Sequence, residues 1–409
     1  MLPFFLNLNI LYKATLIKIP VVLLFSIWTV GCQKPTSNTV FRIQPNEVAA
    51  FRTSAFCERI DYLVLEKNSK NPISTISDVI FKNGIYYISD EVSNVLTAYN
   101  EQGEFIFEID ELGYGFGKYM EITDLFVEDC IYVLCRTERK IIQYDIDTGD
   151  VIAETKLPLY IDGLRSLEKN TYISYSSTGG EITKNGRKAA IGKFIGDSIY
   201  KIEKSFGDNY PQYSFPSKHY FSSTDNNGYL LLNPSDSIYA YANGKVIVKY
   251  TLDFGVLQLP KEKQTLQNTP ANREFLQQSP YVIFKDNLVD TQYFLFMSFI
   301  QGSTREIKYL LYNKRSAQGV HTSSIINDLE SAKPYNFPQF KKDNNTVISV
   351  VELDLIKYYY NRILPIKEQA VQSMGENKFH QLNSFYKKCL KNAQPVLVIS
   401  HLKTGASSL

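Results

Sequence analysis

The sequence predicts an all-β protein, a β-propeller of six blades with a helical insertion before its closing strand. The chain of 409 residues is 44% hydrophobic and 13% aromatic, which is enough to bury a sizeable core. Short β-branched and aromatic runs alternate with Gly, Asn and Asp turns, and the pattern recurs about every 45 residues. Such a period is typical of propeller blades, because one small sheet cannot cover its own faces and radial packing buries both.

The first 31 residues are predicted to be a secretory signal and not part of the fold. Lys13 and Lys18 precede an apolar run over 19–31, and a small residue, Gly31, stands before Cys32. A basic start, a short apolar core and a small residue before the cut are typical of such signals. The run is shorter than the roughly 20 residues that span a bilayer.

Cys32 is the predicted lipidation site. The segment Thr29-Val30-Gly31-Cys32 resembles the lipobox of bacterial lipoproteins, with Thr29 in place of the usual Leu. This resemblance implies acyl chains on Cys32 that anchor the protein to a membrane. An ordinary signal peptide with an incidental cysteine is the alternative. Residues 32–50 are then expected to form a tether, and residues 51–409 the propeller.

The first two repeats are the clearest. Their β-runs cover 81–90, 94–99 and 104–109 in the first repeat, and 126–134, 140–144 and 150–157 in the second. Less regular copies follow at 171–176, 228–250, 293–312 and 346–351. We expect 395–402 and the N-terminal run 59–66 to complete the sixth sheet, since joining the two chain ends removes an open edge.

A helical segment at about 352–391 is predicted before the closing strand. Phe379, Leu382, Tyr386 and Cys389 recur at three and four residues, which is an amphipathic helical period. Pro365 interrupts the helical pattern. We expect this segment to pack against the propeller and not to form a domain of its own.

Composition excludes several classes of function. The chain has 44 basic and 42 acidic side chains, and nucleic-acid binding needs a basic face, so no nucleic-acid partner is expected. Trp28 is the single tryptophan and lies in the signal, which disfavours the WD40 and sialidase types of propeller. Cys57, Cys130, Cys135 and Cys389 form no C-x-x-C pair, so we expect free buried thiols and no zinc site.

A glycine-rich loop carries a family resemblance. Gly113, Gly115 and Gly117 precede Tyr119, with Phe116 where Pro is usual and Lys118 where Glu is usual. With the segments 326–330 and 394–403, this loop resembles the six-bladed β-propeller lipoproteins of Bacteroidetes, relatives of the NHL-repeat propellers. The resemblance implies a fold and a location more than an activity. The implied location is the outer membrane of a Gram-negative envelope, on either its periplasmic or its surface face.

No linear motif predicts a catalytic residue, a metal ligand or a cofactor. The three glycines match neither G-x-G-x-x-G nor a P-loop and are interpreted as a tight turn. Asp145-Ile-Asp147-Thr-Gly149-Asp150 resembles the start of a calcium loop, but a hairpin turn is the favoured interpretation. His219, His321, His380 and His401 are too scattered for a short metal motif.

The candidate ligand-facing loop consists of Tyr114, Phe116, Lys118 and Tyr119. Exposed aromatic side chains at the mouth of the ring would stack on a glycan or a peptide, whereas packing between blades is the alternative.

The sequence therefore predicts a lipid-anchored binding or scaffold protein for an envelope protein or a glycan. One alternative is an NHL-like metal-dependent hydrolase or lyase, whose acidic and Asn ligands would converge on the central tunnel. A second alternative is a carbohydrate-capture lipoprotein, which would need a ring of exposed tyrosines on one face. An enzyme is the less favoured class.

Overall fold

The computed structural model describes residues 41–404, except 68–69, 169–170, 184–185, 196–198, 206–219, 223–227, 234, 243 and 265–268. The predicted signal, Cys32 and the first part of the tether lie outside the described residues. Val40–Leu409 form one compact unit, to which everything below refers. Within the described residues, no helix combines the length and the apolar character needed to cross a bilayer.

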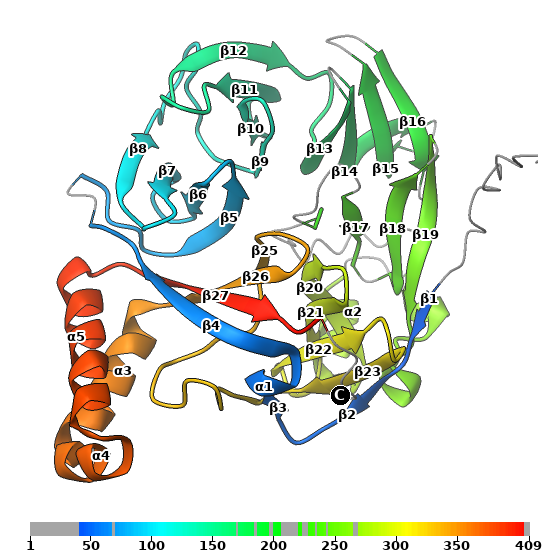
Figure 1. Ribbon diagram of the computed structural model, residues 1–409. Coiled ribbons are helices and arrows are strands. Elements are labelled where there is room, and N and C mark those ends of the chain that lie inside the picture. The colour runs from blue at the N-terminus through cyan, green and yellow to red at the C-terminus, as the bar shows by residue number, and fades with distance from the viewer. Residues whose placement is uncertain are drawn as a thin grey trace, which may run out of the picture. The chain divides into compact units, whose positions relative to one another are not determined.

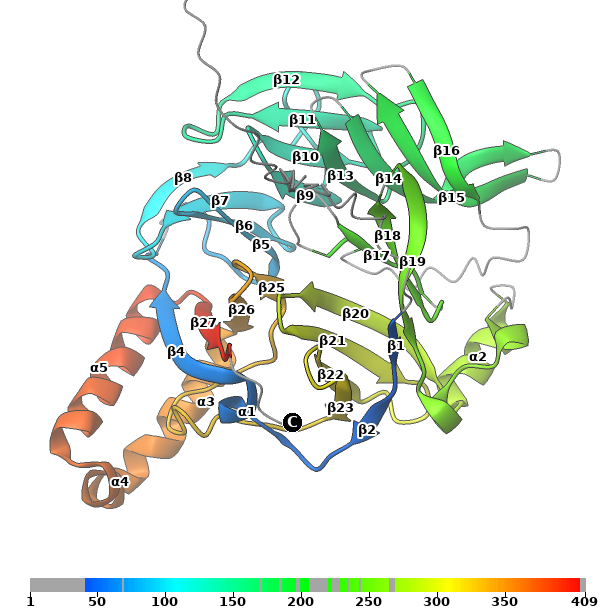
Figure 2. The same ribbon diagram turned by 45° about the vertical axis from the view of Figure 1, so that its right-hand side comes forward.

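The described part of the chain contains six sheets of four or five strands and one small two-stranded sheet (Figures 1 and 2). The first sheet consists of β5 (Ile76–Lys82), β6 (Ile85–Asp90), β7 (Val95–Asn100) and β8 (Phe105–Ile109). The second consists of β9 (Asp124–Val127), β10 (Ile131–Cys135), β11 (Lys140–Tyr144) and β12 (Val151–Lys156). The third consists of β13 (Gly163–Glu168), β14 (Thr171–Thr183), β15 (Gly186–Ile195) and β16 (Ile199–Ser205).

The remaining sheets all include N-terminal strands. The fourth consists of β17 (Tyr229–Leu231), β18 (Ser237–Ala242), β19 (Lys245–Leu252) and β1 (Phe41–Ile43). The fifth consists of β20 (Val282–Asp290), β21 (Phe294–Gln301), β22 (Ile307–Asn313), β23 (Gln318–Thr322) and β2 (Pro45–Glu47). The sixth consists of β25 (Phe340–Lys341), β26 (Thr346–Val351), β27 (Val396–Leu402) and β4 (Cys57–Val64). The small sheet pairs β3 (Phe51–Arg52) with β24 (Ile325–Ile326), and α1 (Thr53–Phe56) follows β3.

The N-terminal segment differs from the expected tether. Residues 41–47 form β1 and β2, which add in parallel to β19 and β23. Ile43 is fully buried among side chains of the fourth and fifth sheets. Burial of this side chain stabilises the pairing. The polar residues on either side of Ile43 gave no sign of these strands.

The two chain ends share the sixth sheet. β27 pairs antiparallel with β4, in a register that places Arg59 opposite His401 and Val64 opposite Val396. Val396 and Val398 are fully buried in one cluster with Ile60 and Val64. The N-terminal strand thus completes a sheet whose other three strands come from the last 70 or so residues of the chain.

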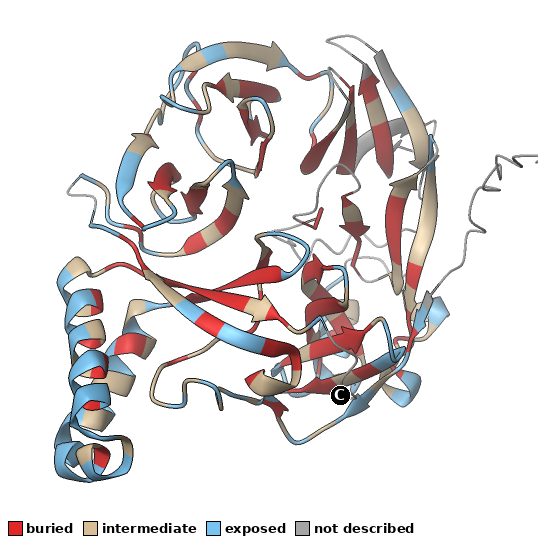
Figure 3. Ribbon diagram, in the orientation of Figure 1, coloured by how far each residue is buried: buried red, intermediate tan, exposed pale blue. Residues whose placement is uncertain are grey.

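The core lies between neighbouring sheets and not at one centre (Figure 3). β5 contacts β9 and β25, β9 contacts β13, and β20 contacts β17 and β25. One cluster of buried side chains lies between the first and second sheets, and another between the first and sixth. Tyrosines fill much of these clusters, and Tyr86, Tyr87, Tyr99 and Tyr144 are almost fully buried.

Helices occupy the connection between β26 and β27, where the helical period lies. They are α3 (Leu353–Ile363), the 3-10 turn Leu364–Ile366, α4 (Lys367–Met374) and α5 (Glu376–Asn392). Phe379, Leu382, Tyr386 and Cys389 are the buried residues of α5. α5 packs against β4, the outer strand of the sixth sheet. A further helix, α2 (Pro270–Gln278), precedes β20.

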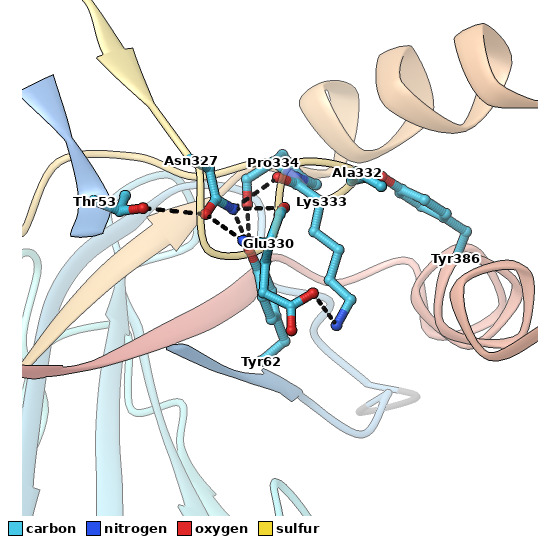
Figure 4. A network of polar contacts seen from close by, with 8 residues as sticks. All are labelled: Thr53, Tyr62, Asn327, Glu330, Ala332, Lys333, Pro334 and Tyr386. Carbon is cyan, nitrogen blue, oxygen red and sulfur yellow. Dashed lines mark hydrogen bonds and ion pairs between the residues drawn. The ribbon is translucent and has the colours of Figure 1, made fainter. Parts of the chain in front are cut away.

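A polar network ties the loop after β24 to the N-terminal strands and to α5 (Figure 4). The Asn327 amide nitrogen donates to the Tyr62 hydroxyl at 2.9 Å and to the main-chain oxygens of Glu330 and Lys333 at 2.9 and 3.0 Å. Its amide oxygen accepts from the Glu330 N–H at 3.0 Å and from the Thr53 hydroxyl at 3.4 Å. One side chain therefore connects α1, β4 and the loop.

The four described cysteines are free, in agreement with the expected thiols. Cys57, Cys135 and Cys389 are buried, whereas Cys130 is half-buried. Burial raises the pKa of the three buried thiols to about 12, so they stay protonated near neutral pH.

Candidate functional site

The glycine-rich loop between β8 and β9 is shaped by its own main chain. The Gly113 N–H donates to the carbonyl of Tyr119 at 2.9 Å. Gly117 has a φ of 71°, and a Cβ at this position would lie 2.5 Å from Cγ2 of Val151. Only glycine fits there, which agrees with the interpretation of this segment as a tight turn.

Hydrogen bonds hold the loop on the second sheet. The Gly117 N–H donates to the Glu154 carboxylate at 3.1 Å, and the Gly117 carbonyl accepts from the Tyr144 hydroxyl at 2.8 Å. The Lys140 ammonium donates to the Gly115 carbonyl at 3.2 Å and to Glu154 at 3.1 Å. The loop is therefore fixed in the absence of any partner.

Tyr119 does not face solvent, which differs from the expectation for this residue. Its side chain is fully buried between the first and second sheets. Its hydroxyl lies 2.9 Å from the carbonyl of Asn94 and 3.0 Å from that of Ile109, and burial raises the pKa of the phenol. Tyr119 anchors the loop, which is the packing alternative considered from the sequence.

Tyr114 and Phe116 extend from the anchored loop into solvent. Their side chains are 82% and 70% exposed, and Leu112 and Met120 beside them are exposed as well. We call Leu112, Tyr114, Phe116 and Met120 the aromatic surface. Lys118 is half-exposed and lies 3.8 Å from the Glu111 carboxylate. The structure thus brings three of the four candidate residues to the surface.

A second exposed feature adjoins the aromatic surface. The guanidinium groups of Arg136 and Arg139 lie 5.7 and 5.5 Å from the ring centre of Tyr160. Glu138, in the same turn, accepts from the Met120 N–H at 2.6 Å. Arginine and tyrosine side chains of this kind are enriched at protein interfaces.

A cavity of about 110 Å³ lies where the first strands of the sheets meet. Its lining includes Asp78, Lys82, Glu128, Arg165 and Lys342. A second cavity, of about 130 Å³, lies between the first and second sheets, and Asp78 lines both. Charged side chains of both signs line the first cavity.

Asp124, which lines the second cavity, is engaged in structural contacts. The Asp124 carboxylate accepts from the Leu164 N–H at 2.8 Å and from the Arg165 guanidinium at 2.7 Å. Arg165 also donates to the carbonyls of Leu164 and Phe221 at 2.6 and 3.3 Å. Among the described residues, no group of three His, Cys, Asp or Glu side chains is placed to hold a metal ion.

The other sequence candidates lie apart from these features. Asp145 accepts hydrogen bonds from the N–H groups of Asp147 and Thr148, which lower its pKa, as in a hairpin turn. His321, His380 and His401 stand on β23, α5 and β27, and His219 lies outside the described residues.

The chain is similar to known proteins in its sequence profile and in its fold. The sequence profile of a domain of unknown function, DUF4934, matches residues 39–400. The chain belongs to the DUF4934 family. No curated protein sequence matches this DUF4934 chain. Its structure is similar to that of a Bacteroides fragilis protein inferred to be exported, with a TM-score of 0.66 and 15% identity over 90% of this chain and 100% of the other. That likeness shows the fold alone.

More distant structures share less of the DUF4934 fold. A streptogramin B lyase aligns over 71% of this chain and 79% of its own, with 16% identity and a TM-score of 0.35. BamB from Moraxella catarrhalis aligns over 90% and 96%, with 10% identity and a TM-score of 0.35.

Some features of the site were not predictable from sequence. Asp124 and Arg165 lie in different repeats, and no spacing rule relates them. Arg136, Arg139 and Tyr160 meet only because the turn before β11 lies beside the connection that leads to β13.

Proposed function

We propose that this DUF4934 chain is an exported, lipid-anchored β-propeller that binds a protein partner in the envelope of a Bacteroidetes bacterium. In this proposal the six sheets are six blades of a closed ring. The single observation that carries the binding role is the aromatic surface, where Tyr114 and Phe116 are 82% and 70% exposed on a loop that is already fixed.

The composition of the surface favours a protein over a glycan. Aromatic residues, Met and Arg are enriched where proteins bind one another. Leu112 and Met120 are exposed in the same loop as the aromatic pair, and the Met120 N–H donates to Glu138, which lies in the turn of the Arg139 that flanks Tyr160. A fixed loop loses little conformational entropy on binding, which supports affinity. The exposed tyrosines of the described residues, Tyr114, Tyr160 and Tyr358, lie on separate elements and do not form the ring that glycan capture requires.

The hydrolase alternative receives no support at the axis. A metal-dependent site needs carboxylates available as ligands. The Asp124 carboxylate is instead engaged by Arg165 and by a main-chain N–H. We therefore do not propose an enzymatic activity.

Replacing both Tyr114 and Phe116 with Ala is expected to abolish partner capture. The tagged mature domain is incubated with an envelope extract of the producing bacterium, and captured proteins are quantified by mass spectrometry. We expect at least a tenfold loss of the specific partner, because truncation of two central aromatic anchors typically costs about 2 kcal/mol or more each.

The matched control replaces two exposed apolar residues elsewhere, Tyr358 on α3, which is 53% exposed, and Val256, which is 90% exposed. Tyr358→Ala with Val256→Ala should capture the partner as the unmodified domain does. Equal capture by both double variants would refute the binding role of the aromatic surface.

Lipid anchoring predicts a specific labelling result. Cells that express the full chain and take up radioactive palmitate should label the protein, and Cys32→Ala should remove the label. Both chains must be present at comparable levels by immunoblot. Labelling of the Cys32→Ala chain at the unmodified level would refute the anchor.

A further inference from the structure

This protein adds extended segments to the outer edges of its own sheets. β1 pairs in parallel with β19, and β2 pairs in parallel with β23. In each case the added strand comes from the N-terminal segment, far away in sequence from the strand it meets. The outer edge of a sheet in this fold is thus able to accept a parallel strand.

The pairing on β19 shows which main-chain groups are used. β19 has a register shift opposite Ile238 and Tyr239, so that Lys249 is an extra residue, and β1 pairs with the next three residues, Tyr250–Leu252. The Leu252 N–H points inward, to the carbonyl of Asp236 at 2.8 Å. The Asp253 N–H points outward, to the carbonyl of Ile43 at 2.8 Å.

β12 of the second sheet repeats this geometry, and no strand from the described part of the chain adds to it. Its register shifts opposite Gln143 and Tyr144, so that Ile152 is the extra residue. The Leu157 N–H points inward, to the carbonyl of Arg139 at 2.7 Å. Since directions alternate along a strand, the N–H groups of Glu154 and Lys156 point outward, as that of Asp253 does. Ala153–Thr155 therefore correspond to Tyr250–Leu252.

The other outer edges in the described part of the chain are covered or protected. β1 covers β19, β2 covers β23, and α5 packs against β4. On β8, the Phe105 N–H donates to Glu66, and Lys70 and Asn71 contact Glu108. β16 carries Lys201 and Lys204 and contacts β19, and lysines on an edge oppose pairing.

Among the described residues, no segment covers β12, and its one lysine, Lys156, stands at the C-terminal end of the strand. Ile152 is 50% exposed, Ala153 and Thr155 are uncharged, and the Glu154 carboxylate is engaged by Gly117 and Lys140. An exposed edge of this kind invites pairing with another chain. The Gly117 contact also places the loop that carries the aromatic surface directly beside this edge.

We propose that β12 is the docking edge for an extended strand of the envelope partner, which adds in parallel as β1 adds to β19. The occupant is an extended polypeptide segment, either unfolded or at the edge of a sheet. Its main-chain N–H and C=O groups form hydrogen bonds with the main chain of Glu154 and Lys156, and one of its apolar side chains contacts the aromatic surface. This inference rests on the proposed function, because it specifies how the same partner binds.

The experiment removes one outward donor and keeps the fold. Lys156→Pro deletes the outward N–H, and proline is tolerated on edge strands where that N–H faces solvent. Lys156→Ala is the matched control, since it loses the same side chain but keeps the N–H. Both variants should unfold at a temperature within a few degrees of the unmodified domain, measured by circular dichroism.

We expect Lys156→Pro to reduce capture from the envelope extract at least tenfold, and Lys156→Ala to reduce it less than threefold. In the captured complex, amide hydrogen exchange at Glu154 and Lys156 should slow by at least tenfold relative to the free domain.

Each alternative outcome is distinct. Strand addition is overturned if Lys156→Pro captures as much partner as Lys156→Ala does, or if amide exchange on β12 is unchanged in the complex. In that case, loss of capture by the double variant of Tyr114 and Phe116 would still support the proposed function. Loss in neither variant overturns both. Slowed β12 exchange in a concentrated sample without extract, together with a dimeric mass, would identify a second copy as the occupant and overturn the partner strand.

Discussion

Replacing Asn327 with Ala is expected to destabilise the domain by about 2–4 kcal/mol, because several half-buried polar groups lose their partner at once. The amide bonds the Tyr62 hydroxyl, the Thr53 hydroxyl and three main-chain groups of the loop after β24. Water cannot readily replace all of them in a packed loop. The free energy of unfolding, from urea titration of the mature domain, measures the effect.

Two controls separate the network from a general effect of losing an amide. Asn344 is exposed, and within the described part of the chain its side chain makes no hydrogen bond, so Asn344→Ala should lie within about 0.5 kcal/mol of the unmodified domain. Tyr62→Phe removes one hydroxyl and should cost about 1 kcal/mol. An Asn327→Ala domain as stable as the Asn344→Ala control would show that the network does not hold the loop.

The network also explains why Asn327 is more than a turn residue. It joins α1 and β4, from the N-terminus, to a loop that precedes the sixth sheet. The Tyr386 hydroxyl of α5 donates to the carbonyl of Ala332 in the same loop at 2.5 Å. In the sequence, the segment 326–330 carries only a family resemblance, whereas its contacts with α1, β4 and α5 appear only in the fold.

Much of the β-architecture was predictable because most strands of each sheet are consecutive in sequence. β6, β7, β10 and β11 coincide with runs of β-branched and aromatic residues. The period of Phe379, Leu382, Tyr386 and Cys389 likewise predicted the buried face of α5. The pairing of β4 with β27 followed from the argument that an open sheet edge must be closed.

Features that depend on distant parts of the chain were not predictable. β1 and β2 are three residues each, too short for a periodic signal, and their partners lie about 200 and 270 residues away. Lys285 is fully buried 3.5 Å from Asp236 of the neighbouring sheet, and burial lowers its pKa. Nothing in the spacing of these two residues relates them.

The candidate loop shows the same limit at short range. Tyr114 and Tyr119 are five positions apart and have the same side chain, yet one is almost fully exposed and the other fully buried. The difference arises because the carbonyls of Asn94 and Ile109 accept hydrogen bonds from the Tyr119 hydroxyl. Composition identifies a loop of this kind as a candidate surface, but contacts with other elements decide which residues reach solvent.

A disulfide between β4 and β27 is expected to stabilise the domain by about 2–4 kcal/mol, because it would close a loop of nearly the whole domain in the unfolded state. Arg59 and His401 are cross-strand partners, and their side chains lie 2.8 Å apart. Both are partly exposed, so Cys at these positions should cost little in packing. The midpoint of urea unfolding, with and without reductant, measures the gain.

The most direct test of the account is whether the two ends of the chain meet in one sheet. The mature domain with Arg59→Cys and His401→Cys is oxidised, and its mobility is compared with and without reductant. The control pairs Arg59→Cys with Lys245→Cys, an exposed position on β19 of the fourth sheet. The account predicts a complete reductant-sensitive mobility shift for the first pair and none for the control. If neither double-cysteine variant changes its mobility on oxidation, closure of the sixth sheet by the N-terminal strand is contradicted.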